Sequence, residues 1–268
     1  MKVVRTKDEL RSALEPFRGG RIGLVPTMGA FHDGHLALLH AAREECNTVV
    51  CSLFVNPTQF GQGEDLETYP RDEKRDLELA QAEGVDFLFA PSPEEMYPRD
   101  FETWVEPERL ALELEGVIRP SHFRGMATIC LKLFNIVRPN VAYFGAKDAQ
   151  QLAVIERLVR DLDLELEIRP VETVREENGL ALSSRNVYLS PTERRIALAL
   201  PRALARGAEA ARDGGDPVAA TRAVLDEEPG LKTQYVAVTD YVGPRLLAAV
   251  QVGKTRLIDN VSLKGAAR

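Results

Sequence analysis

Two histidines, His32 and His35, lie three residues apart in a loop of small residues. A short apolar run at residues 22–25 precedes the loop, and apolar residues at helical spacing follow Gly34. This spacing predicts a strand, a loop and a helix, with both imidazoles at or just before the first helical turn. Gly29 and Gly34 allow sharp turns or close approach of a ligand to the backbone. Unpaired N–H groups and the positive dipole end favour a phosphate there, so the pattern predicts a nucleotide site.

Two other interpretations of this segment stay open. An ordinary strand–loop–helix corner with two surface histidines has the same pattern. Residues three apart on a helix also share a face, so His32 and His35 could ligate zinc. The zinc interpretation is weaker because catalytic zinc normally takes about three protein ligands, and no further His, Cys or Glu stands beside the pair to complete such a set.

A second polar segment follows the apolar run at residues 49–55. Ligands of an open parallel sheet collect beyond the carboxyl ends of its strands, so Asn56 and Gln59 should face the same crevice as His35. The Gln59 amide both donates and accepts hydrogen bonds, which suits a hydroxyl beside a carboxylate. An Asx-Pro turn with a solvated amide explains Asn56 without any ligand. The acidic pair at residues 64–65 either contacts a metal or is simply solvated.

Two later segments supply cations for a phosphate. Lys147 lies in a glycine turn between a strand-like and a helix-like run, with Asp148 as N-cap and Gln151 in the first helical turn. Arg185 follows two adjacent hydroxyls in a short polar loop, residues 179–186. Each cation taken alone is more often a surface charge. Their shared position at strand ends, opposite the histidine loop, favours one common site.

Composition agrees with an intracellular enzyme. The chain has 268 residues, 44% of them hydrophobic, and a net charge of −7. A negative net charge argues against a nucleic-acid partner, because such binding needs a basic face. The three cysteines are an odd number in apolar surroundings, which predicts buried free thiols in a reducing, cytoplasmic location. We find neither a signal peptide nor an apolar run long enough to span a membrane, so no membrane partner is expected.

Short apolar runs alternate with helical patterns through the first 175 residues, which predicts an α/β fold with a parallel sheet covered by helices. Pro26 should end the first strand, because proline cannot continue a ladder. After Arg185 the pattern changes to a compact α+β domain, with a long helix capped by Ser190 and Glu193 and extending to about residue 212. The expected strands are 22–25, 49–55, 85–89, 141–144, 164–174, 235–238 and 255–259, and the other expected helices are 36–45, 72–83, 124–137, 149–161 and 216–227.

Four ordered segments carry a family resemblance that covers nearly the whole chain. They are PTMGAFHDGH, FVNPTQFGQGEDLETYPR, RPSHFRGMATICLKLFNIVRPNVAYFGAKDAQQL and GLALSSRN. Together they closely resemble the pantothenate synthetase family, the ATP-dependent ligases that join pantoate to β-alanine. The resemblance implies a Rossmann-like domain at residues 1–176, with helices on both faces of the sheet. It also implies a smaller C-terminal domain at residues 177–268 that closes over ATP, and a homodimer.

The resemblance also implies roles for individual residues. His35 matches the proton donor and His32 a phosphate contact, and Lys147 and Arg185 complete the expected catalytic set. Gln59 and Gln151 match positions that hold pantoate, with Asn56 beside them. The ATP-binding positions are Met28, Gly29, Ala30, Phe31, His32, Asp33, Gly34, His35, Gly145, Ala146, Lys147, Asp148, Val174, Leu182, Ser183, Ser184 and Arg185.

The implied chemistry has two steps. The pantoate carboxylate attacks the α-phosphate of ATP, which gives pantoyl adenylate and pyrophosphate, and the β-alanine amine then displaces AMP. The protein must align two anions and stabilise phosphoryl charge, with Mg²⁺ as cofactor. The acyl adenylate must be shielded from water, and the loop at residues 61–69 is a candidate lid.

Some residues depart from the family pattern or have no firm role. Ala146 and Ala149 stand where the family usually has Glu and Tyr. Arg119 and residues 122–124 belong either to the substrate region or to a structural turn. A nucleotidyltransferase with a phosphorylated acceptor would favour additional Arg or Lys in place of the amides. A non-catalytic nucleotide-binding protein on the same fold is the other rival.

Overall fold

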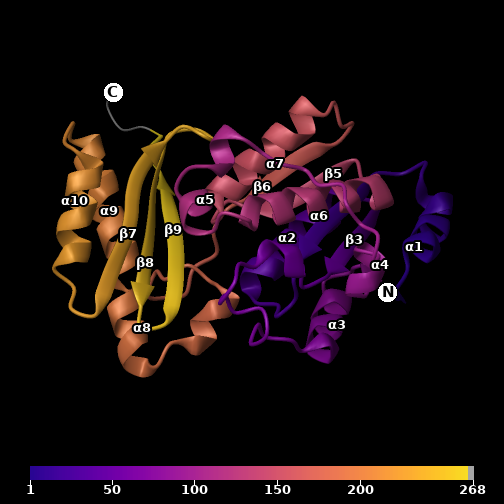
Figure 1. The fold of residues 1–268 in the computed structure, drawn as a ribbon, viewed down its shortest axis with the longest axis horizontal. Coiled ribbons are helices and arrows are strands. Elements are labelled where there is room, and N and C mark those ends of the chain that lie inside the picture. Colours follow the sequence, from indigo (N-terminus) through magenta and orange to yellow (C-terminus); the bar gives the residue numbers. More distant parts are fainter. Residues whose placement is uncertain (265–268) are drawn as a thin grey trace. The chain divides into compact units, whose positions relative to one another are not determined.

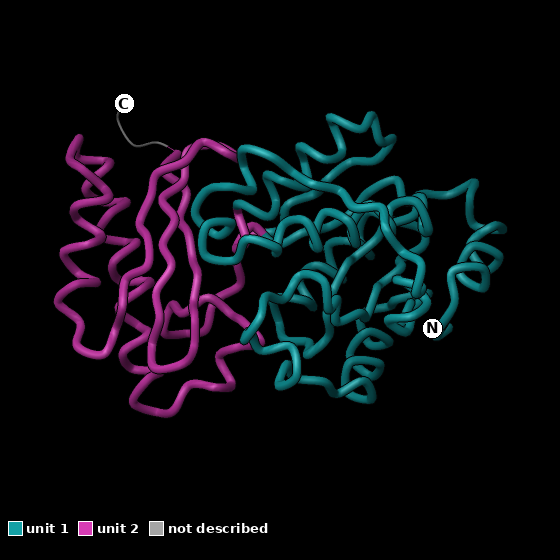
Figure 2. The backbone as a smooth tube through the Cα atoms, viewed as in Figure 1, with its two compact units in different colours: residues 1–145, 150–171 teal, residues 146–149, 172–268 magenta. Residues whose placement is uncertain are grey.

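The chain divides into two compact units in the computed structural model, which describes residues 1–264 (Figure 2). Unit 1 comprises residues 1–145 and 150–171, and unit 2 comprises residues 146–149 and the chain from Glu172 onward. The short segment 146–149 therefore groups with the C-terminal part of the chain. The domain division expected from the sequence, 1–176 and 177–268, stays a prediction.

Unit 1 is built on a six-stranded, wholly parallel sheet with the order β1-β4-β3-β2-β5-β6 (Figure 1). This confirms the predicted α/β class, and each predicted strand in this part of the chain overlaps an observed one. The three-residue β1 had no recognisable pattern. The strands are β1 Lys2–Val4, β2 Ile22–Thr27, β3 Thr48–Leu53, β4 Phe87–Phe89, β5 Val141–Gly145 and β6 Glu167–Val171.

The prediction that Pro26 ends its strand is wrong. β2 continues to Thr27, and Pro26 is paired in register with Ser52 of β3. On its other side β2 pairs with β5 only at Gly23 and Leu24. Pro26 therefore lies where β2 has a single neighbour, so the missing N–H leaves no ladder bond unmade.

Helices cover both faces of this sheet. Successive residues of β5 point to opposite faces. The Tyr143 hydroxyl donates to Glu45 of α2 at 3.1 Å, whereas the Phe144 ring lies 6.4 Å from the Phe134 ring of α6. The helical segments of unit 1 are α1 Lys7–Leu14, α2 Asp33–Glu45, α3 Glu73–Ala82, α4 Pro93–Met96, α5 Glu115–Ile118, α6 His122–Val137 and α7 Ala149–Asp161, with 3₁₀ turns at η1 Glu15–Phe17, η2 Pro57–Gln59 and η3 Arg109–Ala111.

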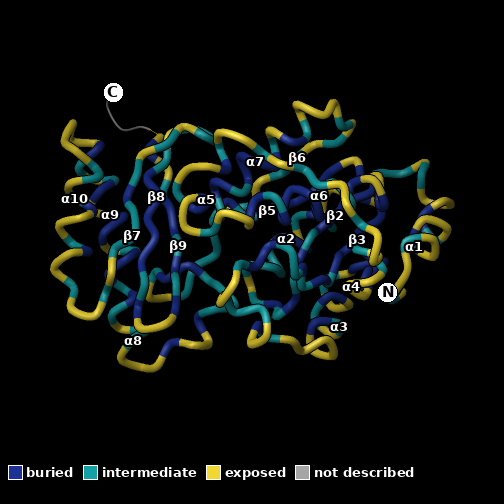
Figure 3. The backbone as a smooth tube through the Cα atoms, in the orientation of Figure 1, coloured by how far each residue is buried: buried dark blue, intermediate teal, exposed yellow. Residues whose placement is uncertain are grey.

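Unit 2 contains a three-stranded antiparallel sheet and a layer of helices, the compact α+β pattern that the sequence predicts. The middle strand, β8, is the one strand there with no predicted counterpart. Figure 3 shows it buried along most of its length. The elements are η4 Ser184–Tyr188, α8 Pro191–Ala197, α9 Ala199–Arg212, α10 Pro217–Asp226, β7 Leu231–Thr239, β8 Arg245–Val252 and β9 Thr255–Ser262.

The single long helix expected after Ser190 is two helices. Its start is as predicted, with a reciprocal capping box between Ser190 and Glu193. The helix then breaks at Leu198, between α8 and α9. Pro201 explains the break, because a proline lacks the N–H that would bond to the carbonyl of Ala197 and its ring clashes with that carbonyl.

Cys46, Cys51 and Cys130 are free and buried, as predicted. Between residues 1 and 264 we find no helix with the length and apolar character needed to cross a bilayer.

Gly125→Ala should destabilise the protein. A Cβ at this position of α6 would lie 2.3 Å from the Thr58 carbonyl oxygen and 2.7 Å from the Gln59 nitrogen, so α6 or η2 must move. Overlap with backbone atoms at these distances should cost about 3 kcal/mol, and the helix-propensity gain of about 1 kcal/mol offsets only part of it. Urea unfolding measures the change. Gly19→Ala is the control, since a Cβ there meets nothing within 4 Å, and equal stability of the two variants would contradict this packing argument.

Candidate active site

Two histidines cap the start of α2. His32 is the N-cap residue, and its Nδ1 accepts a hydrogen bond from the Gly34 N–H at 3.1 Å. In return, Nδ1 of His35 accepts from the His32 N–H at 3.4 Å, which completes a capping box. The ring centroids lie 4.2 Å apart. Because each Nδ1 is an acceptor, each neutral ring carries its proton on Nε2.

The turn before these histidines is held by a buried carboxylate. Gly29 and Ala30 both have left-handed backbone conformations, with φ of +84° and +55°. Asp76 of α3 accepts hydrogen bonds from the N–H groups of Ala30 at 2.9 Å and Phe31 at 2.8 Å. Burial raises the pKa of Asp76, although these two donors act against the shift. Asp76 therefore fixes the loop, a role that no sequence signal indicated, since helix periodicity cannot identify the partner of a buried acid.

Gln59 lies at the end of η2 beside this loop. Its Nε2 donates to Met28 Sδ at 3.0 Å, and its Oε1 accepts from Asn56 Nδ2 at 3.1 Å. The second N–H of Asn56 donates to the Gly125 carbonyl at 3.1 Å. The Asn56 oxygen accepts from the Tyr97 hydroxyl and from Thr58. Both amide N–H groups of the buried Asn56 are thus used within the protein, and Asn56 orients Gln59.

The backbone of Gln59 is held from the other side by Arg119 and His122. Its carbonyl accepts from Arg119 Nη2 at 3.3 Å and from His122 Nδ1 at 3.0 Å. A carbonyl can only accept, so the His122 proton is on Nδ1. Burial, together with the charge of Arg119, lowers the pKa of His122 to about 4. His122 is therefore a neutral donor at neutral pH.

Glu64 forms an ion pair, which was neither of the two roles that we expected for it. Arg119 donates to both of its carboxylate oxygens, at 2.9 and 2.7 Å. Burial alone would raise the pKa of Glu64, but the hydrogen bonds and charge of Arg119 lower it. The loop at residues 61–69 is thereby tied to Arg119, and Arg119 in turn to Gln59.

Gln151 lies in the first turn of α7 and is half-buried. The preceding residue, Gln150, is buried and holds the neighbouring loop. Its Nε2 donates to the carbonyls of Leu110 and Glu113, and its Oε1 accepts from the Glu115 N–H. The adjacent glutamines thus have different surroundings, and Gln151 is the more accessible of the two.

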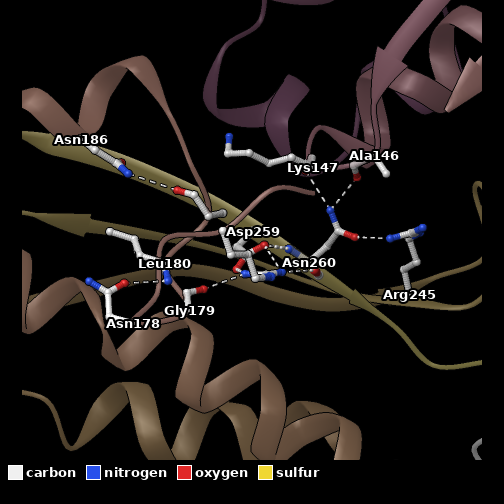
Figure 4. A network of polar contacts seen from close by, with 11 residues as sticks. Ala146, Lys147, Asn178, Gly179, Leu180, Asn186, Arg245, Asp259 and Asn260 are labelled. Atoms are coloured by element: carbon white, nitrogen blue, oxygen red, sulfur yellow. Dashed lines mark hydrogen bonds and ion pairs between the residues drawn. The ribbon is translucent and has the colours of Figure 1, made fainter. Parts of the chain in front are cut away.

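The expected cations Lys147 and Arg185 both belong to unit 2. Asn260 of β9 donates from Nδ2 to the carbonyls of Ala146 at 2.9 Å and Lys147 at 2.8 Å (Figure 4). Lys147 Nζ lies 3.9 Å from an Asp148 oxygen. The departures Ala146 and Ala149 are both buried, so these small side chains are part of the packing of the turn.

The segment that contains Arg185 is ordered by local hydrogen bonds. The Leu182 N–H donates to the Val174 carbonyl at 3.0 Å, which brings two of the expected ATP-binding positions together. Ser183 caps η4, because its hydroxyl accepts from the Arg185 N–H at 3.3 Å. Ser184 and Arg185 form the first turn of η4.

The protein family of the chain follows from its similarity to known proteins. A family model described as pantoate-beta-alanine ligase matches residues 2–262. The chain belongs to the pantoate–β-alanine ligase family. Members of this family catalyse a step of pantothenate biosynthesis, and the protein is a ligase of that pathway.

Individual relatives agree with this assignment over nearly their full length. The chain is 52% identical to the pantothenate synthetase of Heliobacterium modesticaldum, over 97% of this chain and 99% of the relative. It is 51% identical to that of Pelotomaculum thermopropionicum, over 98% and 99%.

Solved structures of the family have the same fold. The pantothenate synthetase of Thermus thermophilus aligns with a TM-score of 0.94 at 48% identity, covering 98% of this chain and 99% of the other. The pantoate-beta-alanine ligase of Francisella tularensis, described as complexed with Beta-gamma ATP and Beta-alanine, aligns with a TM-score of 0.86 at 36% identity, covering 98% of each chain.

His122 should make the protein less stable as the pH falls from about 6.5 to about 4. In the unfolded chain its imidazole takes up a proton near pH 6.5, whereas in the folded protein it does so only near pH 4. Protonation therefore favours unfolding between these values, by on the order of 3 kcal/mol at pH 4.

Urea unfolding of the wild type and of His122→Gln between pH 7 and 4.5 measures this effect. Glutamine retains a donor for the Gln59 carbonyl but does not titrate, so the variant should lose less stability on acidification. Glu64 adds a loss below its ordinary pKa, and both proteins share most of it because Arg119 contributes more than His122 to its lowered pKa. His40→Gln, at an exposed site of α2, is the control. Identical pH slopes for the wild type and His122→Gln would contradict the prediction.

Proposed function

We propose that the enzyme condenses pantoate with β-alanine in two steps, through pantoyl adenylate, with release of pyrophosphate and then AMP. The observation that carries this proposal is the pair of histidines that cap α2, beside Gln59. The contact of Met28 with Gln59 places the start of α2, the proposed nucleotide site, next to an uncharged amide of fixed orientation. This combination suits an adenylated carboxylate better than a phosphorylated acceptor.

We propose that His35 and His32 donate hydrogen bonds to the phosphates of ATP. Nδ1 of each ring accepts a hydrogen bond from a backbone N–H of the cap, so the proton of each neutral ring is on Nε2. An anion at the start of α2 gains from these protons and from the helix dipole. The negative charge that develops on the α-phosphate during carboxylate attack is stabilised in this way. The zinc alternative would need about three protein ligands, and no further His, Cys or Glu stands beside the pair in the sequence.

Gln59 and Gln151 are the proposed pantoate ligands. Asn56 and the Met28 sulfur fix the orientation of the Gln59 amide, so less conformational entropy is lost on binding. Asn56 itself acts through Gln59, because its N–H groups are both used internally. A nucleotidyltransferase that accepts a phosphorylated alcohol would favour arginine or lysine at such positions.

The remaining ATP contacts are proposed for the loop at residues 28–35, the turn at residues 145–148 and the segment with Val174 and residues 182–185. Lys147 and Arg185 supply positive charge for the phosphates, and the hydroxyls of Ser183 and Ser184 supply polar contacts. The retention of His35, Lys147 and Arg185 favours an active enzyme over a non-catalytic relative.

Mg²⁺ is proposed to enter with ATP as part of the substrate. The described residues contain no metal-binding cluster of their own, and Mg²⁺ typically uses substrate phosphates with one or two carboxylates at most. A homodimer and a cytoplasmic location are also proposed. The dimer rests on the family resemblance, and the location rests on three buried free thiols, which suit a reducing compartment.

The reaction is tested by pyrophosphate release from ATP and Mg²⁺ with pantoate, with and without β-alanine. Pyrophosphate that depends on pantoate alone, followed by AMP and pantothenate only after β-alanine is added, is the expected result. His35→Ala and Lys147→Ala should each slow the first step by about 10²–10³-fold, since each removes a donor to the developing phosphoryl charge.

His40→Ala and Lys254→Ala are the matched controls. His40 lies on the exposed face of α2, and Lys254 lies in the turn between β8 and β9. Both controls should adenylate pantoate at the wild-type rate. A folded His35→Ala protein with an unchanged rate of pyrophosphate release would remove His35 from the mechanism.

Gln59→Ala should raise KM for pantoate by about tenfold while KM for ATP changes little, because it removes one oriented pair of hydrogen bonds to the acid. Steady-state kinetics with each substrate varied in turn gives both constants. Gln81→Ala, at an exposed position of α3, is the control. An equal rise in both KM values would mean that Gln59 acts on the nucleotide as well.

A further inference from the structure

We propose that Asn260, supported by the Asp259–Arg175 ion pair, is a positioning residue for adenylate formation. It sets the backbone of Lys147 and joins it to the segment that contains Arg185. This inference rests on the proposed role of Lys147 as an ATP contact. Neither Asn260 nor the two residues that support it had a signal in the sequence motifs.

Asn260 is 3% exposed, and its side-chain amide is fully occupied (Figure 4). Its two N–H groups donate to consecutive carbonyls, those of Ala146 and Lys147. Its oxygen accepts from Arg245 Nη1 at 2.6 Å, which fixes which way the amide faces. Two consecutive carbonyls bonded to one amide determine the path of the turn, and hence the direction in which the Lys147 side chain leaves the backbone.

Asp259 extends this support to the second segment. It is 2% exposed and accepts two hydrogen bonds from Arg175, at 2.7 and 3.0 Å, and one from the Asn260 N–H at 2.7 Å. Arg175 also donates to the carbonyls of Gly179 and Asn260. One buried carboxylate thus holds both the residue that positions Lys147 and the start of the polar loop.

The far end of that loop is held in the same way. Asn186 donates to the Ala181 carbonyl and to Glu176, both at 3.1 Å. Glu176 is in turn paired with Arg194 at 2.7 Å. Residues 182–185 lie between these two anchors, and the first of them, Arg175, belongs to the network that holds the turn with Lys147.

A buried polar network of this kind contributes little net free energy to folding. Apolar residues of similar volume often replace a buried ion pair without loss of stability, whereas removing one partner leaves a buried group unsatisfied. The amide N–H groups of Asn260 instead end on the turn that contains Lys147, and Arg175 and Asn186 donate to carbonyls of the loop that leads to Arg185. We therefore expect the network to act on the geometry of the chemical step.

Asn260→Ala should slow pantoate-dependent pyrophosphate release by about ten- to a hundredfold, since a shift of about 1 Å in a reacting group can cost a hundredfold. A double-mutant cycle separates positioning from general stability. If Asn260 acts through Lys147, the protein with both Asn260→Ala and Lys147→Ala should be no slower than Lys147→Ala alone. A purely structural residue would give additive losses.

Asn260→Asp serves if the alanine variant does not fold. The carboxylate keeps the acceptor for Arg245 but cannot donate to the two carbonyls, so the same non-additivity is expected. Gln234→Ala is the control, because Gln234 makes side-chain hydrogen bonds to Gln251 and Arg256 within the same sheet and none to the turn. It should adenylate at the wild-type rate, and its melting temperature measures the loss of an ordinary sheet contact.

The outcomes separate the two proposals. A wild-type rate in Lys147→Ala would overturn the role of Lys147 and, with it, this inference. A slow Lys147→Ala with either a wild-type rate in both Asn260 variants or fully additive losses would overturn the positioning role alone. Non-additive losses with an unaffected control would support both.

Discussion

The parallel sheet imposes the constraint on which the candidate site of unit 1 depends. Its strands all run the same way, so the segments that leave β3, β2 and β5 leave from one edge, and these three strands are neighbours in the sheet. The histidine loop follows β2, Asn56 and Gln59 follow β3, and the lysine turn follows β5. The histidine loop and the segment with Asn56 and Gln59 are far apart in the chain, and they emerge beside one another for this reason.

Buried polar side chains then convert this approximate proximity into defined geometry. Asp76 holds the left-handed turn before the histidines, Asn56 holds Gln59, and Asn260 holds the turn with Lys147. In each case a buried group uses its hydrogen-bonding capacity on the protein and fixes a neighbouring residue that we propose as a substrate contact. This division of labour follows from the cost of an unsatisfied buried group, which leaves such residues little freedom to bind a ligand as well.

Much of the fold could be predicted because its signals are local. Apolar runs located every strand of the parallel sheet except β1, and the capping box located the start of α8. The failures were also physical. Pro26 continues a strand because its neighbour on one side is absent, and Pro201 splits a helix that the composition favours. β8 was missed because a buried central strand rich in Leu and Ala has no alternation to distinguish it from a helix.

The sequence by itself determined the α/β class, the family, and the residue types that can hold an adenylated acid, because strand and helix patterns and spaced motifs are properties of short segments. The tertiary structure decided which atoms of those residues are available. Nδ1 of each histidine accepts a hydrogen bond within the helix cap. The Asn56 amide donates to Gln59 and to a backbone carbonyl, and Glu64 pairs with Arg119. Hydrogen bonds between residues distant in the chain depend on how the elements pack, and no local pattern encodes their partners.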